Sequence, residues 1–159
     1  MSRTTVTILL ALVLLAAAPG LASAHCQVPC GIYDDAARIA RMYEDAATIE
    51  KAMAQMAELA GNIEVQSANQ LARWVATKEE HASNIISVVS EYFLTQKVKP
   101  VAAGQEGRDA YLAGLADHHA VMAAAMKTKQ NTSLDYVAAL RTALDALSVH
   151  YDTEHLHRQ

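Results

Sequence analysis

The 159-residue sequence has little of what builds a β-sheet or binds nucleic acid. Aromatic residues make up only 5% of it, and no alternating stretch rich in Val, Ile and Thr occurs. Alanine is abundant instead, which favours helices over sheet. The formal net charge is −4, so a broad cationic surface for nucleic acid is excluded. We expect one helical domain whose partners do not include nucleic acid.

Long apolar runs are also absent, except in residues 1–24. Arg3 precedes the run "TVTILLALVLLAAA", and "PGLASA" then supplies small residues at Ala22 and Ala24. The run is short for a mature transmembrane helix, and the layout is typical of a secretory signal peptide with an A-x-A cleavage site. We predict cleavage after Ala24, export to the periplasm or the extracellular space, and no membrane segment in the mature chain. The alternative is a retained N-terminal anchor.

Cysteine is scarce as well. The chain has two, Cys26 and Cys30, in the stretch "HCQVPCG" directly after the predicted cleavage site. In an exported protein two cysteines most often form a disulfide, and a zinc or copper-carrier site is a further alternative. A c-type haem is excluded, because the spacing is C-x-x-x-C and no histidine follows Cys30.

Cleavage after Ala24 would create a compact set of nitrogen and sulfur donors. His25 would offer its α-amine and its imidazole, Cys26 a backbone amide and a thiolate, and Cys30 a second thiolate. The amine and the adjacent amide close a five-membered chelate ring, and the sulfur of Cys26 closes a second ring. Two nitrogens and two thiolates in one plane, with an axial imidazole, suit Ni(II) or Cu(II) better than tetrahedral zinc. Copper(II) tends to oxidise thiolates, which favours nickel.

Four amphipathic segments are predicted in residues 34–159, preceded by an irregular hook at residues 25–33. Their apolar residues recur at steps of three and four, and short connections join them, which predicts an all-α, up-down-up-down four-helix bundle. The expected boundaries are a first helix from the N-cap pair Asp34–Asp35 to Gly61, a second ending before Pro100, a third from about Arg108 to Lys129, and a fourth opening with the capping-box-like pattern Thr132-x-x-Asp135.

Several histidines and lysines of these helices are expected to have structural rather than catalytic roles. His119 is expected on the apolar stripe of the third helix, where it would pack. His81 is expected to be solvated or partly buried. Solvated helix faces are expected for Lys78, Lys97 and Lys99.

The stretch "HCQVPCGIYDD" resembles the nickel hook of the nickel-containing superoxide dismutases, whose motif reads H-C-x-x-P-C-G-x-Y. "RWVATKEEHA", "SEYFLTQKVKP" and "AMKTKQ" are similar to further segments of that family, so the resemblance covers residues 25–150. All the specified positions of the motif are present: His25, Cys26, Pro29, Cys30, Gly31 and Tyr33.

The resemblance implies an enzyme that disproportionates superoxide, a small anion, to dioxygen and hydrogen peroxide by Ni(II)/Ni(III) cycling. It implies one nickel ion per subunit, with His25, Cys26 and Cys30 as ligands. Tyr33 would line the approach to the metal. Tyr92 would lie near the hook of a neighbouring subunit, because the family assembles as a homohexamer.

Two positions depart from patterns seen in some members. Gln27 stands where an acidic residue occurs, and Ala40, allowing one deletion, stands where a glutamate orients the axial imidazole. Glu44 or a residue of another chain is then the candidate for that contact. The alternative function is a non-enzymatic exported helical bundle with a disulfide or a copper or zinc carrier site.

Overall fold

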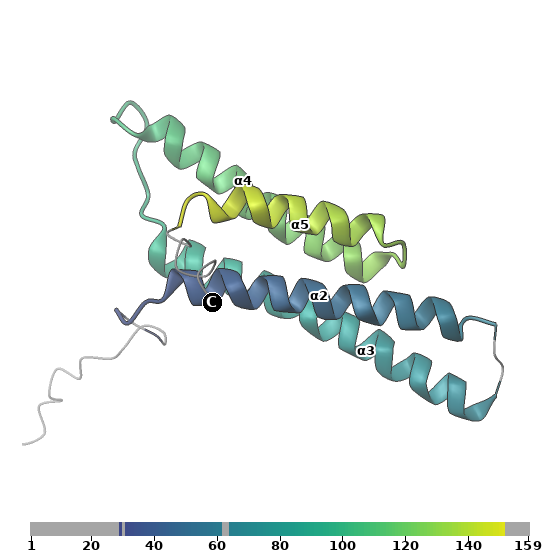
Figure 1. Cartoon of the computed structure of the whole chain (residues 1–159). Helices are drawn as coiled ribbons and strands as arrows, with labels where there is room; N and C mark the ends of the chain where they lie inside the picture. Colours follow the sequence, from purple (N-terminus) through teal and green to yellow (C-terminus); the bar gives the residue numbers. More distant parts are fainter. Residues whose placement is uncertain (1–28, 30, 62–63, 152–159) are drawn as a thin grey trace, which may run out of the picture. The chain divides into compact units, whose positions relative to one another are not determined.

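The computed structural model describes residues 29, 31–61 and 64–151, which contain helices and no strands (Figure 1). The chain divides into two compact units, residues 1–33 and 34–159. No helix of the described residues is long and apolar enough to cross a membrane. The helices of the larger unit are α2 (Asp35–Leu59), α3 (Val65–Ser87), the π-helix η1 (Val88–Lys97), α4 (Arg108–Gln130) and α5 (Asp135–Ser148).

The larger unit is a four-helix bundle, as predicted, in which η1 continues α3 without a break. α2 packs on α3, α3 on α4, α4 on α5, and α5 on α2, so the helices close a ring. Successive helices alternate in direction (Figure 1). The start of α2, the end of η1, the start of α4 and the end of α5 therefore share one end of the bundle.

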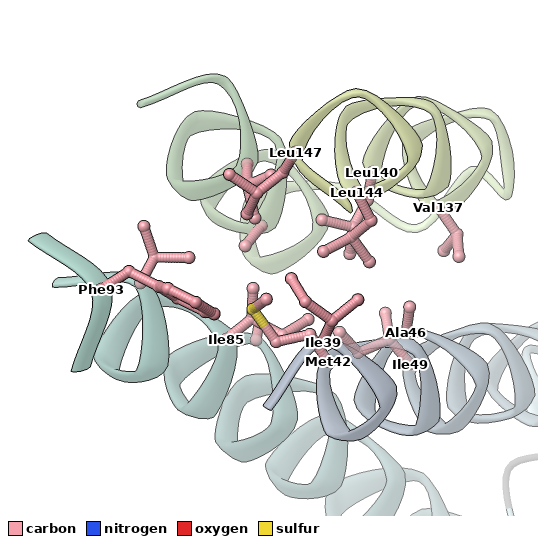
Figure 2. Close-up of a cluster of buried hydrophobic side chains, with 14 of the residues drawn as sticks. Ile39, Met42, Ala46, Ile49, Ile85, Phe93, Val137, Leu140, Leu144 and Leu147 are labelled. Atoms are coloured by element: carbon pink, nitrogen blue, oxygen red, sulfur yellow. The ribbon is translucent and has the colours of Figure 1, made fainter. Parts of the chain in front are cut away.

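The core lies between the α2–α3 and α4–α5 layers. Figure 2 shows the leucines of α5 facing the apolar seam of α2, with Phe93 of η1 closing the cluster on one side. The seam confirms the three-and-four spacing expected from the sequence. Its fully buried members on α2 and α5 are Ile39, Met42, Ala46, Ile49, Met53, Val137, Leu140, Leu144 and Leu147.

Local signals at both ends of α2 act as predicted. The carboxylate of Asp34 accepts a hydrogen bond from the backbone N–H of Ala37 at 2.9 Å, which is an N-cap contact. Gly61, just beyond the helix end, has a φ of 136°. Side chains rarely adopt such a dihedral, so glycine suits the position where the chain leaves the helix.

The predicted capping box at the start of the last helix is wrong. Asp135 is the first residue of α5, and its backbone N–H donates to the hydroxyl of Ser133 at 3.3 Å. That hydroxyl donates in turn to the Asp135 carboxylate at 2.9 Å. The serine two residues before the helix thus takes the local bond expected of Thr132, because a short side chain bonds most easily to the nearest backbone group.

The π-helix η1 was not predicted from the sequence. Its carbonyls accept hydrogen bonds from side chains five residues further on. The Thr95 hydroxyl donates to the carbonyl of Ser90 at 2.7 Å, and the Gln96 amide donates to that of Glu91 at 3.0 Å. The widened turn allows two consecutive aromatic residues, Tyr92 and Phe93, to be buried together. π-Helical segments are rare and often lie at functional sites.

The register of the third helix differs from the prediction by one residue. His118, not His119, faces the interior, at 2% exposure, and His119 is exposed. The stripe expected to be apolar is partly exposed, with Leu112 at 45% and Met126 at 43%. The helix can bury a histidine because the ring finds polar partners inside the bundle.

Lys78 is also placed differently from the prediction, since its side chain is only 3% exposed. Its ammonium group donates to the carbonyls of Thr128 at 2.8 Å and Lys129 at 2.6 Å, and pairs with Glu79 at 2.8 Å. These carbonyls belong to the last turn of α4, where a cation is favoured by the helix dipole. The lysine therefore joins α3 to the end of α4.

Replacing Lys78 tests this join. We expect Lys78→Met to lower the free energy of unfolding by about 2 kcal/mol, because it leaves two carbonyls without a charged donor. Urea denaturation followed by circular dichroism measures the change. The matched control is Lys51→Met, at an exposed position of α2, which should unfold like the parent. Equal stability of the two variants would contradict the role assigned to Lys78.

Candidate metal centre

The described part of the predicted hook contains a tight turn. The backbone N–H of Ile32 donates to the carbonyl of Pro29 at 2.9 Å, and Gly31, the third residue of the turn, has a φ of 87°. A turn with positive φ at this position favours glycine. Nothing lies within 4 Å of a Cβ built at Gly31, so the backbone dihedral rather than lack of space selects glycine. This accounts for the glycine after the second cysteine in the motif.

The three predicted metal ligands, His25, Cys26 and Cys30, lie outside the described residues, and their role stays a prediction. Their donor chemistry fits nickel, because thiolates and amine or amide nitrogens suit a tetragonal ion. In residues 29, 31–61 and 64–151, no three His, Cys, Asp or Glu side chains gather into a group that could hold a metal. The described helices thus offer no competing metal site.

The two predicted catalytic tyrosines lie in different units. Tyr33 is 39% exposed, in the smaller unit. Tyr92, on η1, is 5% exposed, and its hydroxyl donates to the Asp35 carboxylate at 2.7 Å. The other oxygen of Asp35 pairs with the ammonium of Lys97 at 3.0 Å. One carboxylate in the first turn of α2 thus contacts two residues of η1, Tyr92 near its middle and Lys97 at its end.

The surroundings of Tyr92 keep it in the phenol form. Burial and the hydrogen bond to Asp35 raise the pKa of Tyr92 well above its usual range, although the guanidinium of Arg38 acts in the opposite direction. That guanidinium lies 5.1 Å from the centre of the Tyr92 ring. The tyrosine is therefore an oriented O–H donor at any physiological pH.

A second tyrosine lies at the same end of the bundle and was not singled out from the sequence. The hydroxyl of Tyr151 lies 2.7 Å from Nε2 of His118, whose Nδ1 lies 2.6 Å from the carbonyl of Gly114. The ring of Phe93 lies between the two tyrosines, with centroid distances of 4.9 Å to Tyr92 and 4.4 Å to Tyr151. No local motif marks this arrangement, because its members come from η1, from α4 and from the segment that follows α5.

Three further residues named in the sequence analysis lie on α2 and α3. His81 is partly buried, as expected, with Nδ1 2.5 Å from a carboxylate oxygen of Asp45. Ala40 is half-buried on α2, and Glu44 is exposed on the same helix. Asp45, a buried acid with one oxygen lacking a hydrogen-bond partner among the described residues, was missed in the sequence because it lies among apolar residues of the seam.

Comparison with known families decides the identity. The model of the nickel-containing superoxide dismutases matches residues 21–155, which takes in the hook and the bundle together. The chain belongs to this family. It is accordingly an oxidoreductase that disproportionates superoxide, with nickel as its cofactor. No curated protein and no solved structure matches the chain. Nothing supports the alternative of a non-enzymatic carrier.

The buried histidine of this dismutase makes its stability depend on pH. Burial lowers the pKa of His118 below the ordinary value of 6.5. The unfolded chain therefore binds a proton more readily than the folded one. The resulting contribution to stability is complete above pH 6.5 and is lost as the pH falls below it, through the lowered pKa.

We expect the free energy of unfolding to decrease from about pH 7 to about pH 5, and His118→Gln to make this slope shallower. Urea denaturation at a series of pH values measures both slopes. His119→Gln, which changes the exposed neighbour, is the control and should keep the parent's slope. If His118→Gln keeps it too, the buried imidazole is not the group responsible.

Proposed function

We propose that the mature chain begins at His25 and binds nickel through its first six residues. The ligands are the α-amine and imidazole of His25, the amide nitrogen and thiolate of Cys26, and the thiolate of Cys30. The observation that carries this proposal is the full set of motif positions, together with the Gly31 turn that follows the second cysteine. The family match supports it, because it begins at residue 21 and leaves the apolar N-terminal run outside.

The proposed donor set suits the one-electron redox chemistry that dismutation needs from the metal. Nickel held by these residues would supply one-electron chemistry between its Ni(II) and Ni(III) states, which dismutation of superoxide requires. Two thiolates and a deprotonated amide are strong anionic donors, and anionic donors stabilise the higher oxidation state. The free terminal amine would be a further nitrogen donor, so the uncleaved precursor would lack one donor and be inactive.

The tyrosines are proposed to handle protons. Forming hydrogen peroxide from two superoxide ions consumes two protons, and phenol groups can donate or order the water that donates them. Tyr33, within the hook, is the candidate nearest to the ligands in sequence. Tyr92 has its O–H oriented by Asp35, which we propose is a positioning residue for it.

We also propose that the dismutase is exported and works as a homo-oligomer, a hexamer by resemblance to its family. Export rests on the signal-peptide layout of residues 1–24. Oligomerisation is supported by large apolar side chains left exposed on the bundle, among them Val75, Leu112 and Met126 at 38%, 45% and 43%. Apolar surface of this kind is commonly covered in an assembly.

The cysteine ligands are tested by substitution. Cys26→Ser or Cys30→Ser should abolish nickel binding and dismutase activity, because each removes one of the two proposed thiolate donors. Nickel per chain, measured by elemental analysis, and superoxide consumption are the readouts. Gln27→Ser, in the same hook but not a ligand, should keep one nickel per chain. Retained nickel and activity in either cysteine variant would refute the proposed ligand set.

The terminal amine is tested by extending the chain. Adding one glycine before His25 converts the amine to an amide, and we expect nickel binding and activity to be lost. The control is one glycine added after Gln159, which should change neither. Activity that survives the N-terminal extension would show that the amine is not a ligand.

A further inference from the structure

The hydroxyl of Tyr151 donates a hydrogen bond to a buried base. A carbonyl oxygen only accepts hydrogen bonds, so the contact between Nδ1 of His118 and the carbonyl of Gly114 requires the hydrogen to be on Nδ1. In the neutral ring, Nε2 is then an acceptor, and the Tyr151 hydroxyl donates to it. The lowered pKa of His118 agrees with the neutral form. The structure therefore holds a phenol with a proton acceptor already in place.

Aromatic rings connect this pair to Tyr92. Phe93 contacts Tyr92 edge-on at 4.9 Å, Tyr151 at 4.4 Å and His118 at 5.8 Å, measured between ring centres. Electrons cross such short distances between packed rings readily. An oxidising equivalent that reaches Tyr92 can therefore pass to Tyr151.

We propose that Tyr151 and His118 form a redox-active pair that takes up oxidising equivalents escaping from dismutation. The oxidant is hydroxyl radical: one electron from the reduced enzyme splits the product, hydrogen peroxide, into hydroxide and hydroxyl radical, and the radical becomes hydroxide when it takes up the electron of Tyr151. One electron leaves the Tyr151 phenol for that oxidant, the O–H bond breaks, and the proton forms an N–H bond with Nε2 of His118. The products are a neutral tyrosyl radical, an imidazolium ion and the reduced oxidant.

Tyr151 is better suited to this step than Tyr92. A buried phenol that loses only an electron becomes a cation, which is costly in a medium of low dielectric, so oxidation needs a base that takes the proton. Imidazole is a stronger base than a carboxylate. Nε2 of His118 is such a base and lies 2.7 Å from the Tyr151 hydroxyl, whereas the carboxylate of Asp35, the partner of Tyr92, also pairs with the ammonium of Lys97.

The same site allows the radical to be reduced. A pocket of about 200 Å³ is lined by Tyr151, His118, His150 and Lys97, among others. It has room for a small anion, and one of its lining groups is the ammonium of Lys97, which also pairs with Asp35. Superoxide gives one electron to the radical and leaves as dioxygen, while the proton returns from His118 to the phenolate oxygen. The cycle restores the pair, and the enzyme's own substrate is its reductant.

The source of the oxidant rests on the proposed function, whereas the Tyr151–His118 pair does not. The experiment therefore has two arms, both on the mature full-length chain loaded with nickel. In the first arm a flash-generated ruthenium(III) complex oxidises the protein by one electron. In the second arm hydrogen peroxide is added. Freeze-quench electron paramagnetic resonance detects tyrosyl radicals in both.

We expect a tyrosyl radical in both arms. It should be lost in Tyr151→Phe and strongly reduced in His118→Gln, which keeps the phenol but removes the base. Tyr136→Phe, on α5 and away from the pair, is the control and should keep the signal. A radical that persists in Tyr151→Phe, or that His118→Gln leaves unchanged, would overturn the proposal. A radical in the ruthenium arm with none in the peroxide arm would overturn hydrogen peroxide as the source of the oxidant, whereas no radical in either arm would overturn the pair itself.

A measurement on the parent protein guards against variants that fold poorly. Electron-nuclear double resonance in D₂O should show an exchangeable deuteron hydrogen-bonded to the radical oxygen, donated by the His118 imidazolium. Its absence would contradict proton transfer to His118. The ruthenium arm does not require nickel to be at the hook. If the proposed nickel ligands are wrong, the ruthenium arm still gives the radical, so this failure can be told apart from failure of the Tyr151–His118 pair.

Discussion

The carboxylate of Asp35 is the contact on which the functional end of the bundle depends. It belongs to the first turn of α2, directly after the hook in sequence, and it accepts a hydrogen bond from Tyr92 and pairs with Lys97. Both partners belong to η1. The single side chain thus ties the helix that leaves the hook to the π-helix that carries the second tyrosine. Because Tyr92 is buried, its orientation is determined by this bond and not by solvent.

Charge is arranged locally rather than globally in this dismutase. The chain is acidic overall, with a net charge of −4, which does not attract an anionic substrate. Cationic groups nevertheless occur at the end of the bundle where α2 begins: Arg38 lies over the ring of Tyr92, and Lys97 lines the pocket beside Tyr151. A local field of this kind can guide a small anion even where the overall charge opposes it.

Features determined by neighbours in sequence could be predicted. The seam of α2, its Asp34 cap and the turn at Gly31 follow from short-range geometry, and the hook motif could be recognised because all of its proposed ligands lie within six residues. Features determined by distant partners could not. Tyr92 meets Asp35 across 57 positions, and Tyr151 meets His118 across 33. The same reason explains why His119 was expected in the core in place of His118. It also explains why Lys78, which donates to a carbonyl 50 positions away, was expected in solvent.

The central claim is that nickel is bound by the sulfurs and nitrogens of the processed N-terminus. X-ray absorption at the nickel edge of the purified mature protein tests it most directly, together with mass determination of the intact chain. The account predicts a mass that begins at His25 and a nickel shell that contains two sulfur atoms with nitrogen completing it. A shell of only nitrogen and oxygen, or a mass that places another residue at the N-terminus, would contradict it.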